Sequence, residues 1–126
     1  MNRNASDIVI EIAKALIDAL NENEPDWKGG YIRFEASDGQ YGSNGSYVTA
    51  GGVFLIDPFV FGNLLDRVNE RGIALREALS DDVSKFCVFL LTVDSAFNYK
   101  IDFEKINQSK WKISKLDGAS GLPEGL

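Results

Sequence analysis

The sequence of 126 residues contains no histidine and only one cysteine, Cys87. The lack of histidine excludes Ser-His-Asp and Cys-His nucleophile activation, proton transfer by imidazole, and every zinc site that uses histidine. A single cysteine excludes an intramolecular disulfide and a zinc site made of thiolates. Any catalysis would therefore depend on carboxylates, lysines, tyrosines or a hard metal ion.

The sequence also lacks a long apolar run and a secretion signal. No stretch approaches the roughly 20 apolar residues that a membrane-spanning helix needs. The first residues, MNRNASD, do not show the basic-then-apolar pattern of a secretory signal, and a lone free cysteine suits a reducing compartment. We therefore expect a cytoplasmic protein with no membrane partner, folded as a single domain over residues 1–126.

Acidic residues outnumber basic ones, and the excess is uneven. The net charge is −6. Residues 1–84 contain 14 acidic and 7 basic residues, whereas residues 85–126 contain 5 acidic and 6 basic residues. An acidic protein repels the phosphates of nucleic acids. We therefore expect no nucleic acid partner, and a basic protein is the more natural counterpart.

Residues 5–22 have the periodicity of an amphipathic helix, and Asn4 or Ser6 is suited to cap it. Five apolar residues fall on one side at helical spacing: Val9, Ile12, Ala13, Leu16 and Leu20. The opposite side is a stripe of one lysine, Lys14, and four acids, Asp7, Glu11, Asp18 and Glu22. This stripe is either a solvated helix face or a surface for a partner.

A second helix is predicted to follow Asp57 and Pro58, because aspartate caps helices and proline suits the first turn. Its inner face extends to about residue 79 and contains Phe61, Leu64, Leu65, Val68, Leu75 and Leu79. Gly72 interrupts the periodicity, so we expect a bend or a break there.

Four segments have strand patterns: residues 31–37, 46–56, 84–95 and 97–105. The first two are expected to form a hairpin joined by a turn-rich connection, DGQYGSNGS, with Gly51-Gly52 marking a bulge or sharp twist. Residues 84–95 are apolar on both faces, which predicts a central strand that is covered on each side.

The order of helices and strands predicts an α+β fold, in which an antiparallel sheet of about four strands packs with two main helices. The sequence does not decide whether the helices cover one face of the sheet or both. Residues 117–126 are rich in glycine and are predicted to be a loosely held tail.

The stretch FNYKIDFEK (97–105) alternates apolar and charged residues. Asp102 and Glu104 share a face, and Asp94 could lie near them; such carboxylates can act as acid and base or hold Mg²⁺ or Ca²⁺. A solvated strand face has the same pattern. We expect the second case, with no catalytic residue, no metal and no cofactor. A carboxylate enzyme with a divalent metal and a regulatory module with a small-ligand pocket remain alternatives.

Three features in order resemble the YezG-like family of bacterial antitoxins, which are immunity proteins of polymorphic and contact-dependent toxin systems. They are Pro25-Asp26-Trp27 after an amphipathic helix, Leu75-Arg76-Glu77 within a later helix, and the strand pair VFLLTVDSAFNYKIDF. The resemblance implies a non-enzymatic protein that binds and neutralises a cognate toxin domain. Many such toxins are nucleases with basic clefts, which an acidic protein could occupy.

The acids are the predicted toxin-binding residues. Four lie on the first helix, Asp7, Glu11, Asp18 and Glu22. Asp26, Glu35 and Asp38 extend this patch if the first strand lies alongside, and Asp102 and Glu104 of the last strand are the next candidates. Whether the protein associates with itself is left open by the sequence.

Overall fold

A computed structural model describes residues 4–37, 39–79 and 85–126. It contains a five-stranded antiparallel sheet in the order β3-β2-β1-β4-β5. The elements are α1 (Ala5–Asn23), β1 (Gly29–Ser37), β2 (Gln40–Thr49), β3 (Gly52–Leu55), α2 (Pro58–Phe61), α3 (Leu64–Ala78), β4 (Val88–Asp94), β5 (Tyr99–Glu104) and a 3₁₀ turn (Leu116–Gly118). The predicted α+β fold is confirmed, with five strands instead of about four.

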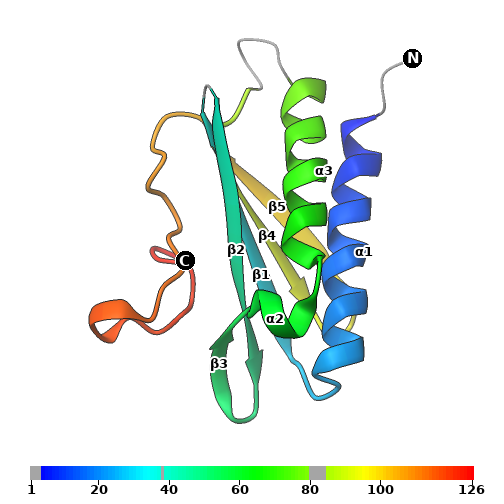
Figure 1. The fold of residues 1–126 in the computed structure, drawn as a ribbon, viewed down its shortest axis with the longest axis vertical. Coiled ribbons are helices and arrows are strands. Elements are labelled where there is room, and N and C mark those ends of the chain that lie inside the picture. Colours follow the sequence, from blue (N-terminus) through cyan, green and yellow to red (C-terminus); the bar gives the residue numbers. More distant parts are fainter. Residues whose placement is uncertain (1–3, 38, 80–84) are drawn as a thin grey trace.

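Helices cover one face of the sheet, where α1 and α3 lie side by side (Figure 1). The Asn4 side chain caps α1 by accepting a hydrogen bond from the Ser6 backbone N–H at 2.8 Å, as one of the two predicted caps would. The five apolar residues expected on its inner side are all buried, and Ile8 joins them. Among the described residues, no helix is long and apolar enough to cross a membrane.

The second helix is interrupted at Gly62, whereas the sequence pattern predicts a bend or break at Gly72. Asp57 caps α2 by accepting from the Phe59 N–H at 2.9 Å, and α2 ends at Gly62, which has a φ of +62°. Gly72 instead lies within α3. A Cβ there would lie 2.7 Å from the ring of Phe34. Gly72 therefore serves close packing of α3 on the sheet and does not break the helix.

The glycine-rich segment expected to be a connection is strand β2. It pairs with β1 along its whole length, from Gly29 opposite Val48 to Ser37 opposite Gln40. The predicted hairpin is confirmed, but its turn is short. Gly51-Gly52 is likewise not a bulge within one strand: Thr49 pairs with Gly52, so the chain turns back here and starts β3. This turn adds the fifth strand.

The C-terminal segment covers the face of the sheet that the helices leave open (Figure 1). The Arg33 side chain donates to the carbonyl oxygens of Lys110 and Gln108 at 2.8 and 2.6 Å. Asn44 Nδ2 donates to the Ile113 carbonyl oxygen at 2.9 Å. Val88 of β4 is fully buried beneath this side of the sheet, which confirms a strand covered on both faces.

The predicted loosely held tail differs from the structure. Gly121 and Pro123 are buried. The Gly121 N–H donates to the Ser114 carbonyl oxygen at 2.9 Å, and the Glu124 N–H to that of Lys112 at 3.0 Å. The glycines of this segment allow local turns, because residues such as Gly121 have a positive φ (+92°). These turns fold the segment back on itself.

Two glycines of β2 provide a matched test of the packing beneath the helices. A Cβ at Gly45 would lie 2.5 Å from the Tyr31 carbonyl oxygen and 2.7 Å from Ile56 Cδ1, whereas nothing lies within 4 Å of one at Gly42. We expect Gly45→Ala to lower the free energy of unfolding by about 1–3 kcal/mol through overpacking. Gly42→Ala should cause no loss. Urea unfolding of both variants checks this, and equal stabilities would contradict the packing described.

Candidate protein-binding surface

The predicted acidic stripe is exposed along α1, but α3 neutralises part of it. Asp7, Asp18 and Glu22 are exposed. Glu11 is half-buried, and its Oε2 lies 3.4 Å from Nη1 of Arg71. Arg71 also pairs with Glu70 on its own helix, and this bond is the main reason that the pKa of Arg71 is raised. The stripe is therefore most strongly acidic away from Arg71.

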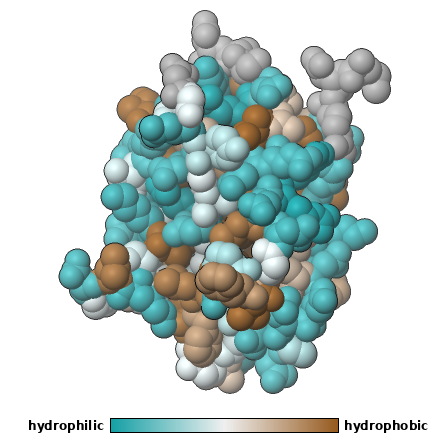
Figure 2. Space-filling view, in the orientation of Figure 1, coloured by the Kyte–Doolittle hydropathy of each residue, from teal (hydrophilic) through white to brown (hydrophobic). Residues whose placement is uncertain are grey.

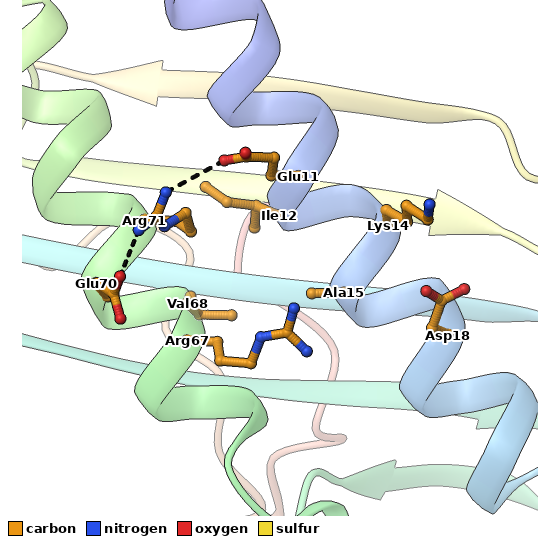
Figure 3. A pocket seen from close by; sticks show the side chains of 9 residues that line it. All are labelled: Glu11, Ile12, Lys14, Ala15, Asp18, Arg67, Val68, Glu70 and Arg71. Atoms are coloured by element: carbon orange, nitrogen blue, oxygen red, sulfur yellow. Dashed lines mark hydrogen bonds and ion pairs between the residues drawn. The ribbon is translucent and has the colours of Figure 1, made fainter. Parts of the chain in front are cut away.

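A groove between α1 and α3 brings the middle of this stripe next to basic residues (Figure 3). Its charged lining comes from Glu11, Lys14 and Asp18 of α1 and from Arg67, Glu70 and Arg71 of α3. Arg67 extends from α3 towards Ala15 of α1 (Figure 3). Because both signs of charge alternate here, the groove has no uniform field that would select one kind of ion.

Two of the other predicted acids, Glu35 and Asp102, lie on the face of the sheet opposite to α1. Asp26 is exposed in the turn after α1. Glu35 points to the opposite face of the sheet, where its carboxylate lies 3.5 Å from Arg33, so the expected extension of the α1 patch through Glu35 is wrong. Asp102 lies on that opposite face too, 3.6 Å from Lys100. Asp38 lies outside the described residues.

Asp94 and Glu104 each stabilise a turn at opposite ends of the β4–β5 hairpin. Asp94 accepts from the N–H groups of Ala96 and Asn98, and the bonds from Asn98 are the largest cause of its lowered pKa. Glu104 accepts from the N–H groups of Ile106 and Asn107. Together with Lys110, these bonds lower the pKa of Glu104 to about 2.

The possible gathering of Asp94, Asp102 and Glu104 into one site is therefore not found. Their carboxylates are spread along the hairpin and satisfied by local partners. Within residues 4–37, 39–79 and 85–126, no three acids or cysteines converge as metal ligands would. In the charged row of β5, Lys100 and Asp102 face solvent, whereas Glu104 stabilises the turn that follows the strand.

Apolar side chains gather on the surface over α2 and β3, at the end of the sheet where these two elements meet (Figure 2). Phe59 of α2 is 99% exposed and its neighbour Val60 is 54% exposed. Phe54 of β3, whose ring stacks on Tyr47 on the α2 side of the sheet, is 42% exposed. Such a cluster is unusual in a protein that binds nothing, because exposed apolar groups usually mark interaction sites when they are contiguous.

The short length of α2 explains why these side chains face outward. Its single turn directs Phe61 into the core, where the ring packs 5.5 Å from that of Tyr47. Phe59 and Val60 then point away from the core. Tyr47 also stacks on Phe54 at 5.6 Å, so one aromatic row connects the core to the surface. This row gives the exposed cluster a rigid base.

Acids of α1 border the cluster. Asp18 and Glu22 line the same hollow as Val60. Glu24 accepts a hydrogen bond from the Tyr47 hydroxyl at 3.1 Å, and burial followed by this bond raises the pKa of Tyr47. Two cations also lie at the rim, Arg67 in the hollow and Lys115 with its Nζ 5.6 Å from the Phe54 ring centroid. We define the α1–α2–β3 surface as Asp18, Glu22, Glu24, Phe54, Asp57, Phe59 and Val60.

Two of the predicted acids, Asp18 and Glu22, thus belong to this surface, whereas its apolar members were missed. The signal was present in DPFVFG. An aspartate cap and a glycine stop only five positions apart leave room for one helical turn. One turn cannot bury Phe59, Val60 and Phe61 together.

Comparison with known proteins adds no identification: no protein family model matches the chain, and no curated protein matches its sequence.

The Glu104 turn predicts an acid-sensitive step in stability. The pKa of Glu104 is about 2 in the folded chain and about 4.3 for a free glutamate. A carboxyl with a lowered folded pKa stabilises the fold above its unfolded pKa and loses that contribution as pH falls towards the folded one. We expect Glu104→Gln to lower stability at pH 7, with the difference from wild type disappearing between about pH 4.5 and 2.

Urea unfolding across this pH range checks the Glu104 prediction. Lys110→Met is the matched variant, because it removes the ion pair at 3.2 Å and keeps the two backbone hydrogen bonds. The backbone bonds are the larger causes of the shift, so this variant should retain most of the pH dependence. A constant difference between wild type and Glu104→Gln at all pH values would contradict the assignment.

Proposed function

We propose that the protein is an immunity protein that binds a cognate bacterial toxin domain through the α1–α2–β3 surface and blocks it without catalysis. The observation that supports this most is the exposed apolar cluster of Phe54, Phe59 and Val60 beside the acids of α1. The resemblance to YezG-like antitoxins in Pro25-Asp26-Trp27 and in the last strand pair agrees with it.

The composition of the surface suits a protein partner. Binding energy in interfaces is concentrated in a few aromatic or apolar anchors that become fully desolvated. Phe59 has the exposure of such an anchor in its free state, and the Phe61–Tyr47–Phe54 row beneath it restricts its helix. A rigid anchor loses little conformational entropy on binding.

The acids supply the second element, which is long-range attraction. Residues 1–84, which include the whole surface, carry 14 acidic and 7 basic residues. Complementary charge mainly speeds association and selects partners, whereas the apolar centre slows dissociation. A basic substrate-binding cleft, such as that of a nuclease toxin, would be attracted to this surface and covered by it.

The apolar anchor predicts a large loss of toxin binding on substitution. Phe59→Ser should weaken binding to the cognate toxin domain of the proposal by about 2 kcal/mol or more, as anchors in interfaces do. Stability should be unchanged, because the Phe59 side chain is 99% exposed. Titration calorimetry and growth rescue on co-expression with the toxic domain measure the two effects.

Ile106→Ser is the matched control for Phe59→Ser. Ile106 is 90% exposed but follows β5, at the other edge of the sheet, so its substitution should leave affinity and rescue unchanged. Equal affinities of both variants would remove the α1–α2–β3 surface from consideration. Failure of the unaltered chain to rescue growth would contradict the immunity function itself.

The α1 acids predict an electrostatic effect of a different kind. The combined variant Asp7→Asn, Glu11→Gln, Asp18→Asn and Glu22→Gln should slow association roughly tenfold or more at low salt and flatten its salt dependence. Folding should be little affected, since a partly exposed pair such as Glu11–Arg71 contributes only about 0–1 kcal/mol. Stopped-flow association at two salt concentrations measures this. An unchanged salt slope would show that the stripe is only a solvated face.

A further inference from the structure

Strand β5 forms an edge of the sheet, and among the described residues it pairs with β4 alone. Helix α1 packs mainly over β1 and β4 and α3 over β1 and β2, so β5 is covered only in part, where Val9 and Leu75 line a hollow with Ile101. Tyr99 and Phe103, on the helix side of β5, are 46% and 37% exposed. An open edge with apolar side chains is a ready template for another strand, and proteins usually protect it.

The backbone of β5 is oriented to accept such a strand. The Asp94 N–H donates to the Asn98 carbonyl oxygen at 3.0 Å, and the Cys87 N–H to that of Glu104 at 2.8 Å. In an antiparallel ladder, alternate residues direct both backbone groups to the same neighbour. Lys100 and Asp102 therefore bond to β4, and the backbone groups of Tyr99, Ile101 and Phe103 point outward from the sheet.

The sequence of β5 is complementary to itself. When two copies of YKIDF pair antiparallel with Ile101 opposite Ile101, Lys100 faces Asp102 and Tyr99 faces Phe103, each twice. Opposite charges and aromatic pairs are favourable across strands. A shift of two residues places Lys100 opposite Lys100 or Asp102 opposite Asp102, which is unfavourable. A shift of one residue turns the apolar row to the wrong face. Charge thus selects one register.

The surroundings of β5 also fit a second copy of the chain. Residues 85–126 have 5 acidic and 6 basic residues, so two such regions can meet without the repulsion expected of a protein with net charge −6. The exposed Lys100 and the half-buried Asp102 lie 3.6 Å apart within one chain, from where each can reach a partner across the edge. Phe97 and Ile10, which line the hollow beside Tyr99, are exposed as well.

We infer that the chain forms a two-fold dimer in which β5 of one copy pairs antiparallel with β5 of the other, centred on Ile101. The two sheets then join into one continuous sheet with all helices on the same side. This contact closes the β5 edges of both copies at once, as a two-fold interface requires. It is independent of the proposed toxin-binding function, because it uses the edge of the sheet opposite to β3.

A charge-swap experiment on the full chain tests both the dimer and its register. Lys100→Glu would place a glutamate opposite Asp102 of the other copy, and Asp102→Lys would place a lysine opposite Lys100. Each variant alone should therefore dimerise roughly tenfold or more weakly than wild type. An equimolar mixture of the two should form a heterodimer, because every facing pair is then of opposite charge. Sedimentation velocity with one variant fluorescently labelled measures all species.

The control is Lys112→Glu, which makes the same change of charge at an exposed residue of the C-terminal segment and should dimerise like wild type. Heterodimer formation also shows that both single variants are folded. A wild-type protein that remains monomeric at several hundred micromolar would overturn the inference. So would a dimer that is unaffected by both swaps, since its interface would lie elsewhere.

Discussion

The close approach of α3 to the sheet at Gly72 sets the arrangement of the other elements. A Cβ on Gly72 would lie only 2.7 Å from the ring of Phe34. That ring stacks on Phe89 of the neighbouring strand, with 5.3 Å between the ring centroids. With α3 held low over β1 and β2, the remaining space above β1 and β4 is filled by α1. The two helices reach only the inner part of β5, where Val9 and Leu75 line a hollow with Ile101. Its apolar row is therefore left at the margin.

A buried arginine organises the opposite face. Arg33 is 6% exposed, and a buried guanidinium is costly unless its donors are satisfied. Here Nε and Nη2 donate to the carbonyl oxygens of Lys110 and Gln108, and Nη1 lies 3.5 Å from the Glu35 carboxylate. The C-terminal segment thus provides the acceptors that make this burial possible, and in return it is held across the sheet although its regular secondary structure is a short 3₁₀ turn.

The sequence predicted the elements whose signals are local. The period of the apolar residues and the Asn4 cap identified α1, and the two-sided apolar character of residues 84–95 identified a covered strand. The sequence-based prediction was wrong where a glycine is required because a residue distant in the sequence packs against it. Gly72 and Gly45 lie inside regular elements because Phe34, Tyr31 and Ile56 occupy the space of a side chain. The contacts of Arg33 with residues more than seventy positions away could not be read from local patterns either.

The candidate binding residues divide in the same way. The acids of α1 were visible as a stripe, because helical periodicity places them together. The apolar cluster was not, since Phe59 and Val60 also fit a longer helix that would bury one of its sides. Glu35 and Asp102 illustrate a further limit: which face of a sheet receives the helices depends on packing, and this decides whether a strand acid lies beside α1 or behind it.

The two margins of the sheet have different chemistry, and this has a consequence for binding. The β3 margin is apolar with an acidic border, which is what the proposed basic partner requires, whereas the β5 margin carries Lys100 and Asp102, the two charges on which the inferred dimer depends. Since β3 and β5 lie at opposite ends of the strand order, pairing through β5 leaves both α1–α2–β3 surfaces free. A dimer would hold these two surfaces at the far ends of a rigid continuous sheet. Such spacing favours bivalent capture of a partner that is itself dimeric, with an avidity that depends on the match between the two separations.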